Sequence, residues 1–210
     1  MLTLSFDTSL DKTYIVLGNN SEILTSLEIK SDEKNYHSAY LISTIADVLK
    51  KHEFTPKDIK RIGVNIGPGS FTGIRAGVTV ARVLAQETNA QTFGISSLEI
   101  LANATPLENP LVILDARKNM GYVWDNKLLG ALELEEIDKI ANNRNILTDN
   151  TLFERYKTFG NNVLSYQEEN YPLGKTLFNL VTIKNADATN VWQNLKPLYI
   201  QPPPVTMKRN

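Results

Sequence analysis

The order of hydrophobic patterns along the chain predicts an α/β protein with helices packed on mixed sheets. Three short runs, residues 2–6, 12–17 and 22–29, have the length and apolar content of strands. A helical pattern follows over residues 38–51, and an apolar run that ends at Gly67 leads into a second helical pattern. Strands and helices in this β-β-β-α-β-α order are typical of a sheet covered by helices.

Turn-forming residues separate the elements of the first half. The first strand ends at Asp7-Thr8-Ser9, and Gly18-Asn19-Asn20 predicts a hairpin between the second and third strands. Thr55-Pro56-Lys57-Asp58 has the form of a helix start. The preceding helix should pack on the sheet, because one of its faces is apolar. That face holds Leu41, Ile45, Val48 and Leu49.

The second half begins after residues 105–110, a boundary rich in proline and polar residues. Residues 111–114 and 122–124 are expected to form strands, and residues 128–152 are expected to contain helical stretches. The tail 201–204 holds three prolines in a row, so we expect it to be extended on the surface.

The two halves share one spacing. Seven positions separate Asp7 from Tyr14, and the same number separates Asp115 from Tyr122. In both cases an aspartate ends the first strand of a half and a tyrosine lies in the next strand. The match is explained either by chance or by an internal duplication.

Composition limits the function. The chain has 210 residues, of which 42% are hydrophobic and 21% charged, and it can bury a substantial core. A net charge of -1 argues against a protein that binds nucleic acid without a partner. With no cysteines, thiolate metal sites and cysteine nucleophiles are excluded. The first residues lack a basic segment, and no apolar run approaches the roughly 20 residues of a membrane helix. We therefore expect a cytoplasmic protein without a membrane partner.

A glycine-rich turn joins the strand that ends at Gly67 to the next helix. Such a turn can bind an anion at the helix N-terminus, or it can let another backbone approach closely. A dinucleotide fingerprint would need a third glycine at Thr72, and a P-loop would need a lysine that this chain lacks here. Both roles stay open on spacing alone. The residues of the turn are Gly67, Pro68, Gly69, Ser70, Thr72 and Gly73.

The helix predicted over residues 74–86 has only one narrow polar stripe, formed by Arg75, Thr79, Arg82 and Gln86. A helix that lies on a sheet needs one apolar face, so something besides its own sheet should cover the rest. One explanation is burial against a neighbouring helix of the same domain, such as 38–51. The other is an interface with a second chain, since burying each Val or Leu is worth roughly 1.5–3 kcal/mol.

Residues 67–75, Gly-Pro-Gly-Ser-Phe-Thr-Gly-Ile-Arg, closely resemble the signature of the bacterial TsaB family, also called YeaZ. Shorter matches to the same family follow in order along the chain, and coverage is good as far as Arg117. They are Leu4 to Ser9, Tyr36 to Ser38, Ser96 to Glu99, Leu114 to Arg117, and Leu198 to Ile200.

The resemblance implies a two-lobed, actin-like (ribonuclease H-like) fold, with residues 1–103 as the N-terminal lobe and residues 104–210 as a reduced second lobe. It also implies a non-catalytic scaffold subunit, with no catalytic residues of its own. The partner would be a TsaD-like enzyme that forms N6-threonylcarbamoyladenosine next to the anticodon of tRNA. A TsaE-like ATPase would join the complex, and tRNA would be contacted only through it.

The same resemblance favours the interface explanation of the apolar helix, because the family pairs with TsaD through helices of the first half. The turn 67–73 would set the angle between strand and helix. Without its partner, the chain should form a homodimer through the same surface. The expected interface residues are Phe71, Ile74, Arg75, Ala76, Gly77, Val80, Ala81, Leu84, Tyr40 and Ile42. A core position is an equal alternative for Phe71.

In actin-like ATPases the end of the first strand binds phosphate, so the resemblance implies Asp7, Thr8 and Ser9 as the residues of a vestigial nucleotide site. The alternative is that Asp7 only caps a turn through its own backbone. The matching strand end of the second half, Asp115 to Lys118, has no glycine, and Gly160 is the nearest candidate for an adenosine corner. No cofactor is therefore expected beyond weak ATP or ADP binding at a subunit junction.

The histidines give no metal site. TsaD proteins carry a second histidine four positions after the one that His37 matches, and such a pair can share a metal. Leu41 occupies that position here. We expect His37 to cap or pack at the helix start.

Two enzymatic alternatives remain. The first is a small actin-fold phosphotransferase that uses Asp7, Thr8 and the turn 67–73 around ATP. The second, weaker alternative is a peptidase acting on glycoproteins. An ATP-dependent activity of the chain alone that is lost with Asp7→Ala would support the first.

Overall fold

The computed structural model describes residues 1–20, 22–30 and 40–201, and these form two five-stranded sheets with helices between and around them. The first sheet has the order β3-β2-β1-β4-β5, in which β1 pairs antiparallel with β2 and parallel with β4. Its strands are β1 (Leu2–Asp7), β2 (Lys12–Gly18), β3 (Ile23–Lys30), β4 (Ile59–Asn65) and β5 (Gln91–Ile95).

Helices cover both faces of this sheet. On one face, α2 (Leu41–Lys51) and α3 (Phe71–Thr88) share a core with alternate residues of β1, such as Leu4 and Phe6. On the other face lie α4 (Ser97–Ala104) and α7 (Leu173–Ile183). A single 3-10 turn, η1 (Pro56–Asp58), precedes β4 and begins with a capping box between Thr55 and Asp58.

The second sheet repeats the plan of the first. Its order β10-β9-β6-β7-β8 places three antiparallel strands beside two parallel ones, as in the first sheet. The strands are β6 (Leu111–Arg117), β7 (Met120–Asp125), β8 (Leu128–Glu133), β9 (Asn145–Thr148) and β10 (Asn162–Ser165). The helices α5 (Leu134–Ala141) and α6 (Asn150–Tyr156) cover its outer face.

The shared plan favours duplication over chance as the explanation of the common spacing, although the registers differ by one residue. Asp7 lies opposite Tyr14, whereas Tyr122 lies opposite Leu114 because of an irregularity between Asp115 and Arg117. The predicted two-lobed α/β fold is confirmed. The second lobe is reduced in the length of its strands and not in their number.

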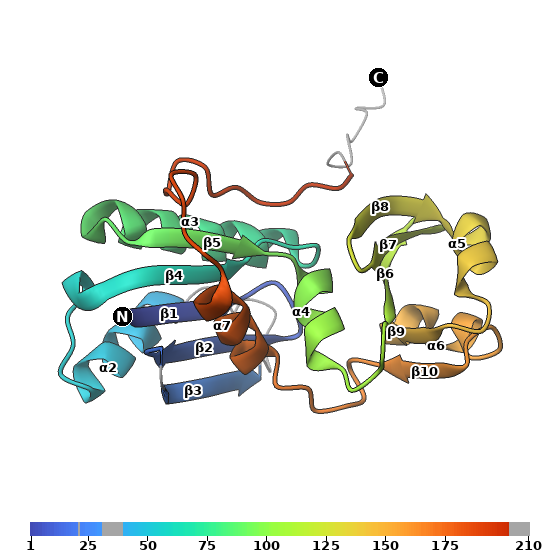
Figure 1. Cartoon of the computed structure of the whole chain (residues 1–210), viewed down its shortest axis with the longest axis horizontal. Helices are drawn as coiled ribbons and strands as arrows, with labels where there is room; N and C mark the ends of the chain where they lie inside the picture. Colours follow the sequence, from blue (N-terminus) through green and yellow to red (C-terminus); the bar gives the residue numbers. More distant parts are fainter. Residues whose placement is uncertain (21, 31–39, 202–210) are drawn as a thin grey trace, which may run out of the picture.

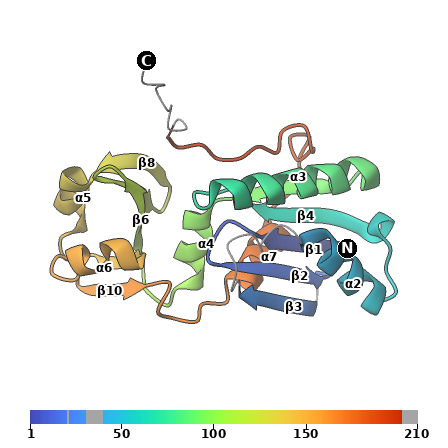
Figure 2. The same cartoon turned by 180° about the vertical axis from the view of Figure 1, so that it is seen from behind.

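The layers follow the order α2/α3, first sheet, α4/α7, second sheet, α5/α6 (Figure 1). The predicted lobe boundary at residue 104 lies between the two sheets, because β5 ends at Ile95 and β6 begins at Leu111. The chain does not, however, stay in the second lobe. After β10 it returns, and α7 packs on β1, β2 and β4 of the first sheet. Residues 185–201, called the C-terminal segment below, then run along α3 toward the second lobe (Figures 1 and 2).

Several elements differ from the sequence prediction. α3 begins at Phe71, three residues before the predicted start, because Ser70 caps it: the Ser70 hydroxyl oxygen accepts a hydrogen bond from Gly73 N (3.2 Å). The stretch 128–152 holds two strands beside its helices. The sequence prediction did not include β5, β10, α4 or α7.

Some predictions concern residues outside the described ranges: the helix start at Ser38, the role of His37, and residues 202–204 of the tail. None of the helices within the described ranges combines the length and the hydropathy that a membrane span requires.

Candidate partner interface

The corner between β4 and α3 lies against the end of β1, and glycines allow this approach. A Cβ on Gly73 would lie 1.8 Å from the backbone oxygen of Thr8, and one on Gly69 would lie 2.4 Å from that of Ser9. Only glycine fits at such distances. Ser9 O also accepts a hydrogen bond from Ser70 N (2.8 Å). Of the two roles open to the glycine-rich turn, these positions serve close backbone approach.

Buried polar side chains hold the turn in place. Asp7 and Asn65 are each 1% exposed, and Asn65 Nδ2 donates to Asp7 Oδ2 (2.8 Å). Asn65 Oδ1 accepts from Gly67 N (2.9 Å), and the Ser97 hydroxyl donates to Pro68 O (2.6 Å). The network therefore links the end of β1 to the turn and to the start of α4.

Both carboxylate oxygens of Asp7 are used inside this network. Oδ1 accepts from Ser9 N (2.7 Å) and from the Ser9 hydroxyl (2.6 Å), while Oδ2 accepts from Asn65. Thr8 Oγ1 donates to Gly73 O (2.7 Å). The residues predicted as a vestigial nucleotide site are thus brought together, but their polar atoms point at the chain itself.

The matching strand end of the second lobe is organised around Asp149. Its Oδ2 accepts from Asp115 N (2.6 Å) and its Oδ1 accepts from Leu152 N (3.0 Å), which caps α6. Burial raises the pKa of Asp149 above its ordinary value, against these hydrogen bonds. Within the described ranges, no three acidic or histidine side chains are grouped so that they could hold a metal ion.

The predicted adenosine corner lies at the wrong edge of the sheet. β10 starts at Asn162, which is paired with Asn145 at the start of β9, and β9 runs parallel to β6. Gly160 therefore lies at the edge where these strands begin, whereas Asp115 lies near the end of β6. Gly160 and Asp115 therefore lie at opposite ends of the strands and do not face one common site.

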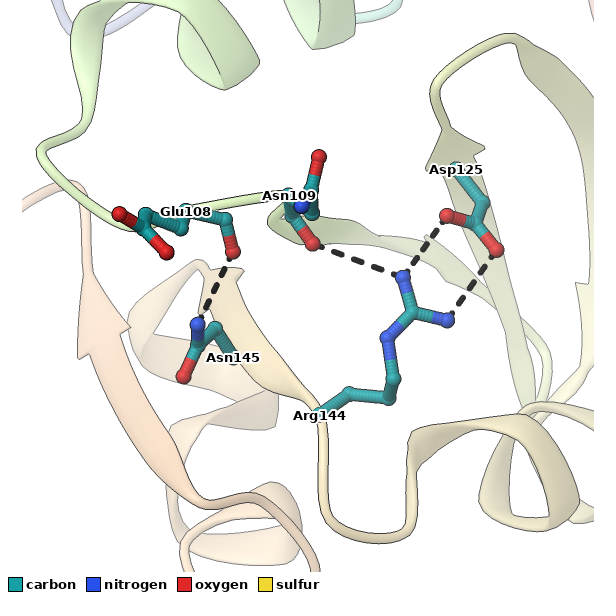
Figure 3. Close-up of polar contacts among 5 residues, drawn as sticks. All are labelled: Glu108, Asn109, Asp125, Arg144 and Asn145. Carbon is teal, nitrogen blue, oxygen red and sulfur yellow. Dashed lines mark hydrogen bonds and ion pairs between the residues drawn. The ribbon is translucent and has the colours of Figure 1, made fainter.

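Near Gly160, a polar cluster closes the same edge (Figure 3). Arg144 donates two hydrogen bonds to the carboxylate of Asp125 (2.8 and 3.2 Å) and one to Asn109 O (3.5 Å). Asn145 Nδ2 donates to Glu108 O (2.9 Å). Because of the bonds from Arg144, the pKa of Asp125 lies below its usual range. The cluster joins the 105–110 connection to β7 and β9.

One face of α3 is buried against its own sheet, and this corrects part of the predicted interface. Ile74 is 4% exposed and Ala81 is fully buried, and Gly77 has Thr8 and Val64 directly beneath it. These three positions lie between helix and sheet, so they are not available to a second chain. Ala81→Arg would therefore disrupt the fold and is not a test of pairing.

The C-terminal segment covers one flank of α3 (Figure 2). Leu195 is buried in the core beneath α3, and Trp192 packs against the same core with the guanidinium of Arg82 5.5 Å from its ring centroid. The sequence predicted that helix 38–51 or another chain would cover the apolar surface of α3. Part of that surface is instead covered by a segment about 110 residues further along the chain.

An exposed aromatic cluster lies at the start of α3. Phe71 and Tyr199 are 44% and 48% exposed, and their ring centroids are 5.7 Å apart. The guanidinium of Arg75 lies 3.9 Å from the centroid of Phe71, and its Nε donates to the Tyr199 hydroxyl (3.1 Å). Phe71 is thus a surface residue and not a core residue. Tyr199 was missed as a site residue, although the match at Leu198 to Ile200 marked its position.

The exposed part of this face, called the α2/α3 surface below, is apolar in composition. Tyr40 and Ile42 are 52% and 66% exposed at the start of α2, and Val83 is 55% exposed on α3. Val83 lies outside the predicted set. The surface consists of Tyr40, Ile42, Phe71, Arg75 and Val83, together with the half-buried Ala76, Val80 and Leu84.

Comparison with known proteins connects this geometry to one family. Residues 29–187, more than half of the chain, match the family model described as TsaD, tRNA N6-adenosine threonylcarbamoyltransferase. The chain is 33% identical over 124 residues to the tRNA threonylcarbamoyladenosine biosynthesis protein TsaB of Bacillus subtilis (58% of this chain, 53% of that protein). It is 29% identical over 128 residues to TsaB of Escherichia coli (59% of this chain, 53% of that protein). The chain thus spans about half the length of the curated relatives it matches.

Among solved structures, the fold is similar to that of YeaZ from Pseudomonas aeruginosa, with a TM-score of 0.73 and 21% identity. The match covers 94% of this chain and 99% of that one. The similarity of fold therefore includes the second lobe.

Proposed function

The chain belongs to the TsaD family and, within it, to the TsaB/YeaZ proteins, and from this premise we propose that it is a non-catalytic scaffold subunit in the synthesis of N6-threonylcarbamoyladenosine in tRNA. A TsaD-like partner would transfer the threonylcarbamoyl group from its adenylate to the adenosine next to the anticodon. A TsaE-like ATPase would join the complex, and tRNA would be bound by the assembly in the cytoplasm.

The α2/α3 surface is the observation that carries the pairing. It places Tyr40, Ile42, Phe71 and Val83, all more than 40% exposed, over two helices that cover one face of the first sheet. Aromatic side chains beside an arginine are typical of the residues that dominate protein interfaces. Exposed Ile42 and Val83 add apolar area to the same surface. The same surface would hold a homodimer together when the partner is missing.

The corner at Asp7 supports a scaffold over an enzyme. A carboxylate that is 1% exposed and already accepts three hydrogen bonds from Ser9 and Asn65 is committed to the fold. An enzyme of the phosphotransferase type would need these oxygens for a hydrated metal or a phosphate.

A reconstitution tests the proposal. The chain is mixed with a TsaD homologue, the mass of the complex is measured by light scattering, and tRNA modification is measured with each protein left out in turn. We expect a heteromeric complex, and modification only when both are present. Modification by the partner alone at the same rate, or ATP-dependent activity of this chain alone, would contradict the scaffold role.

A matched pair of variants locates the surface. Ile42→Glu places a charge on the α2/α3 surface, and Ile140→Glu makes the same change at a 37% exposed position on α5 of the other lobe. We expect Ile42→Glu to abolish pairing and Ile140→Glu to leave it unchanged. Val80→Glu should also weaken pairing, with some loss of stability, because Val80 packs partly on the core. If Ile42→Glu and Ile140→Glu bound the TsaD homologue equally well, the interface would have to lie on another part of the molecule.

A further inference from the structure

The first part of the C-terminal segment is hydrogen-bonded to the first lobe. Thr92 N donates to Asn190 O (3.0 Å), and Asn190 Nδ2 donates back to Thr92 O (3.0 Å), so the segment pairs with the edge strand β5. Leu195 is 5% exposed and lies in the core of the first lobe. This part of the segment is therefore an integral piece of the first lobe.

Its last four described residues leave that lobe. Leu198 N donates to Ile66 O (2.8 Å) at the entry to the glycine-rich turn. Ile200 packs against the core between the lobes, and Gln201 Nε2 lies 3.2 Å from the sulfur of Met120, the first residue of β7. Residues 198–201 thus connect the start of α3 to the second sheet.

The two places where the chain crosses from one lobe to the other lie along the opposite edge. In both views the chain crosses between the lobes at the lower edge, before β6 and after β10, whereas the C-terminal segment runs along the upper edge (Figures 1 and 2). After β10, Gln167 Nε2 donates to Asp11 Oδ2 (2.8 Å) and adds a polar tie between the lobes. Between the edges, α4 packs on β6 and β7.

We propose that residues 198–201 form a latch that fixes the angle between the two lobes. A rotation of the lobes about the two chain crossings at the lower edge, which opens the upper edge, must break the contact of Gln201 with Met120 or pull Leu198 away from Ile66. The two crossings at the lower edge oppose such a rotation much less, because they lie near its axis. The latch also includes Tyr199, so it connects the second lobe to the aromatic cluster.

Distance measurements between spin labels test the latch in the isolated full chain. The chain has no cysteine, so Thr79→Cys on α3 and Lys127→Cys between β7 and β8 create two labelling sites, both exposed and one in each lobe. Pulsed electron paramagnetic resonance then gives the distribution of distances across the upper edge. We expect one narrow distribution for the chain with its latch intact.

The latch is removed with the double variant Leu198→Pro/Gln201→Leu, which lacks the donor to Ile66 O and the donor to Met120. We expect its distribution to be broader and shifted to longer distances. Lys196→Ala, an exposed position of the same segment, is the matched control and should leave the distribution unchanged. An unchanged distribution in the double variant would overturn the proposal.

If the double variant fails to fold, Gln201→Leu alone removes only the contact with the second lobe and keeps the test decisive. A distribution as narrow as that of the parent chain in this variant, with Lys196→Ala behaving the same way, would also overturn the latch. The doubly labelled chain is diluted with unlabelled chain, so that distances between copies of a homodimer do not contribute. No partner protein enters the measurement, so the result does not depend on whether the chain is a scaffold subunit.

Discussion

Gly73→Ala should be a severely destabilising substitution at the corner between strand and helix. The new Cβ would lie 1.8 Å from Thr8 O and 2.8 Å from the Thr8 carbonyl carbon, both of which are backbone atoms. Real Cβ atoms almost never come closer than 3.0 Å to another heavy atom. The start of α3 would therefore have to move away from the end of β1 by about 1.2 Å, the difference between 3.0 and 1.8 Å.

The energetic cost follows from what this movement disturbs. Overpacking typically costs about 1–3 kcal/mol. The bonds from Thr8 Oγ1 to Gly73 O (2.7 Å) and from Ser70 N to Ser9 O (2.8 Å) would be weakened or lost, at about 1 kcal/mol each. Alanine recovers at most about 1 kcal/mol of helix propensity. We expect a net loss of about 2–4 kcal/mol, or roughly 4–16 °C in Tm for a chain of this size.

Gly77→Ala in the same helix is the matched control. Its Cβ would lie 2.9 Å from Thr8 Oγ1 and 3.3 Å from Val64 Cγ2, so the shift needed to reach 3.0 Å is about 0.1 Å and not 1.2 Å, and the loss of stability should be smaller than for Gly73→Ala. Urea unfolding is measured by circular dichroism and by tryptophan fluorescence, because Trp192 reports on the first lobe and Trp124 on the second. Equal stability of Gly73→Ala and the parent chain, or a larger loss for Gly77→Ala, would refute the steric argument.

Three further substitutions probe other parts of the structure. Ser9 and Asn65 both donate hydrogen bonds to the Asp7 carboxylate, so Asp7→Asn would place an amide NH₂ against one of these donors. We expect the free energy of unfolding, measured by thermal unfolding, to fall by about 2–3 kcal/mol. Arg61→Met removes the donors to Thr182 O (3.0 Å) and Lys184 O at the end of α7, and should lower the free energy of unfolding by about 1–3 kcal/mol. Arg61→Lys should not restore this stability, because a single ammonium group cannot reproduce the two separate donors of the planar guanidinium. Arg144→Met should cost about 0.5–1 kcal/mol at pH 7, because Arg144 lowers the pKa of Asp125 and so stabilises the fold above the ordinary aspartate pKa of about 3.9. That contribution is lost as the pH falls through the lowered pKa of the folded state, so the difference in stability between variant and parent in urea titrations should shrink as the pH falls.

Local patterns predicted the elements of the first lobe well. The face of α2 was identified from spacing alone, and Leu41, Ile45, Val48 and Leu49 are all buried. The predicted strands at residues 2–6, 12–17 and 22–29 lie within or next to β1, β2 and β3. Their periodicity is carried by neighbouring residues, so no knowledge of distant contacts is needed. The short strands β9 and β10, of four residues each, are too brief to show a period and were missed.

The candidate site could be predicted only in part. The apolar excess of α3 was correctly identified, but it has three causes: contact with its own sheet, cover by the C-terminal segment, and exposure. Sequence spacing does not separate Ala81, which is buried, from Val83, which is 55% exposed, because both are apolar and both lie outside the polar stripe. The direction in which each side chain points depends on how the helix sits on β4 and β1.

The sequence by itself determined that a glycine-rich turn joins a strand to an apolar helix, and that the chain is an α/β protein of one particular family. These properties depend on residues adjacent in the chain and on a nine-residue motif. Only the tertiary structure decided what the glycines do and which side of the helix stays open. Both depend on segments brought together from distant parts of the chain, Thr8 and Ser9 beneath the turn and Trp192 to Gln201 beside the helix, and contacts of that kind leave no periodic signal in the sequence.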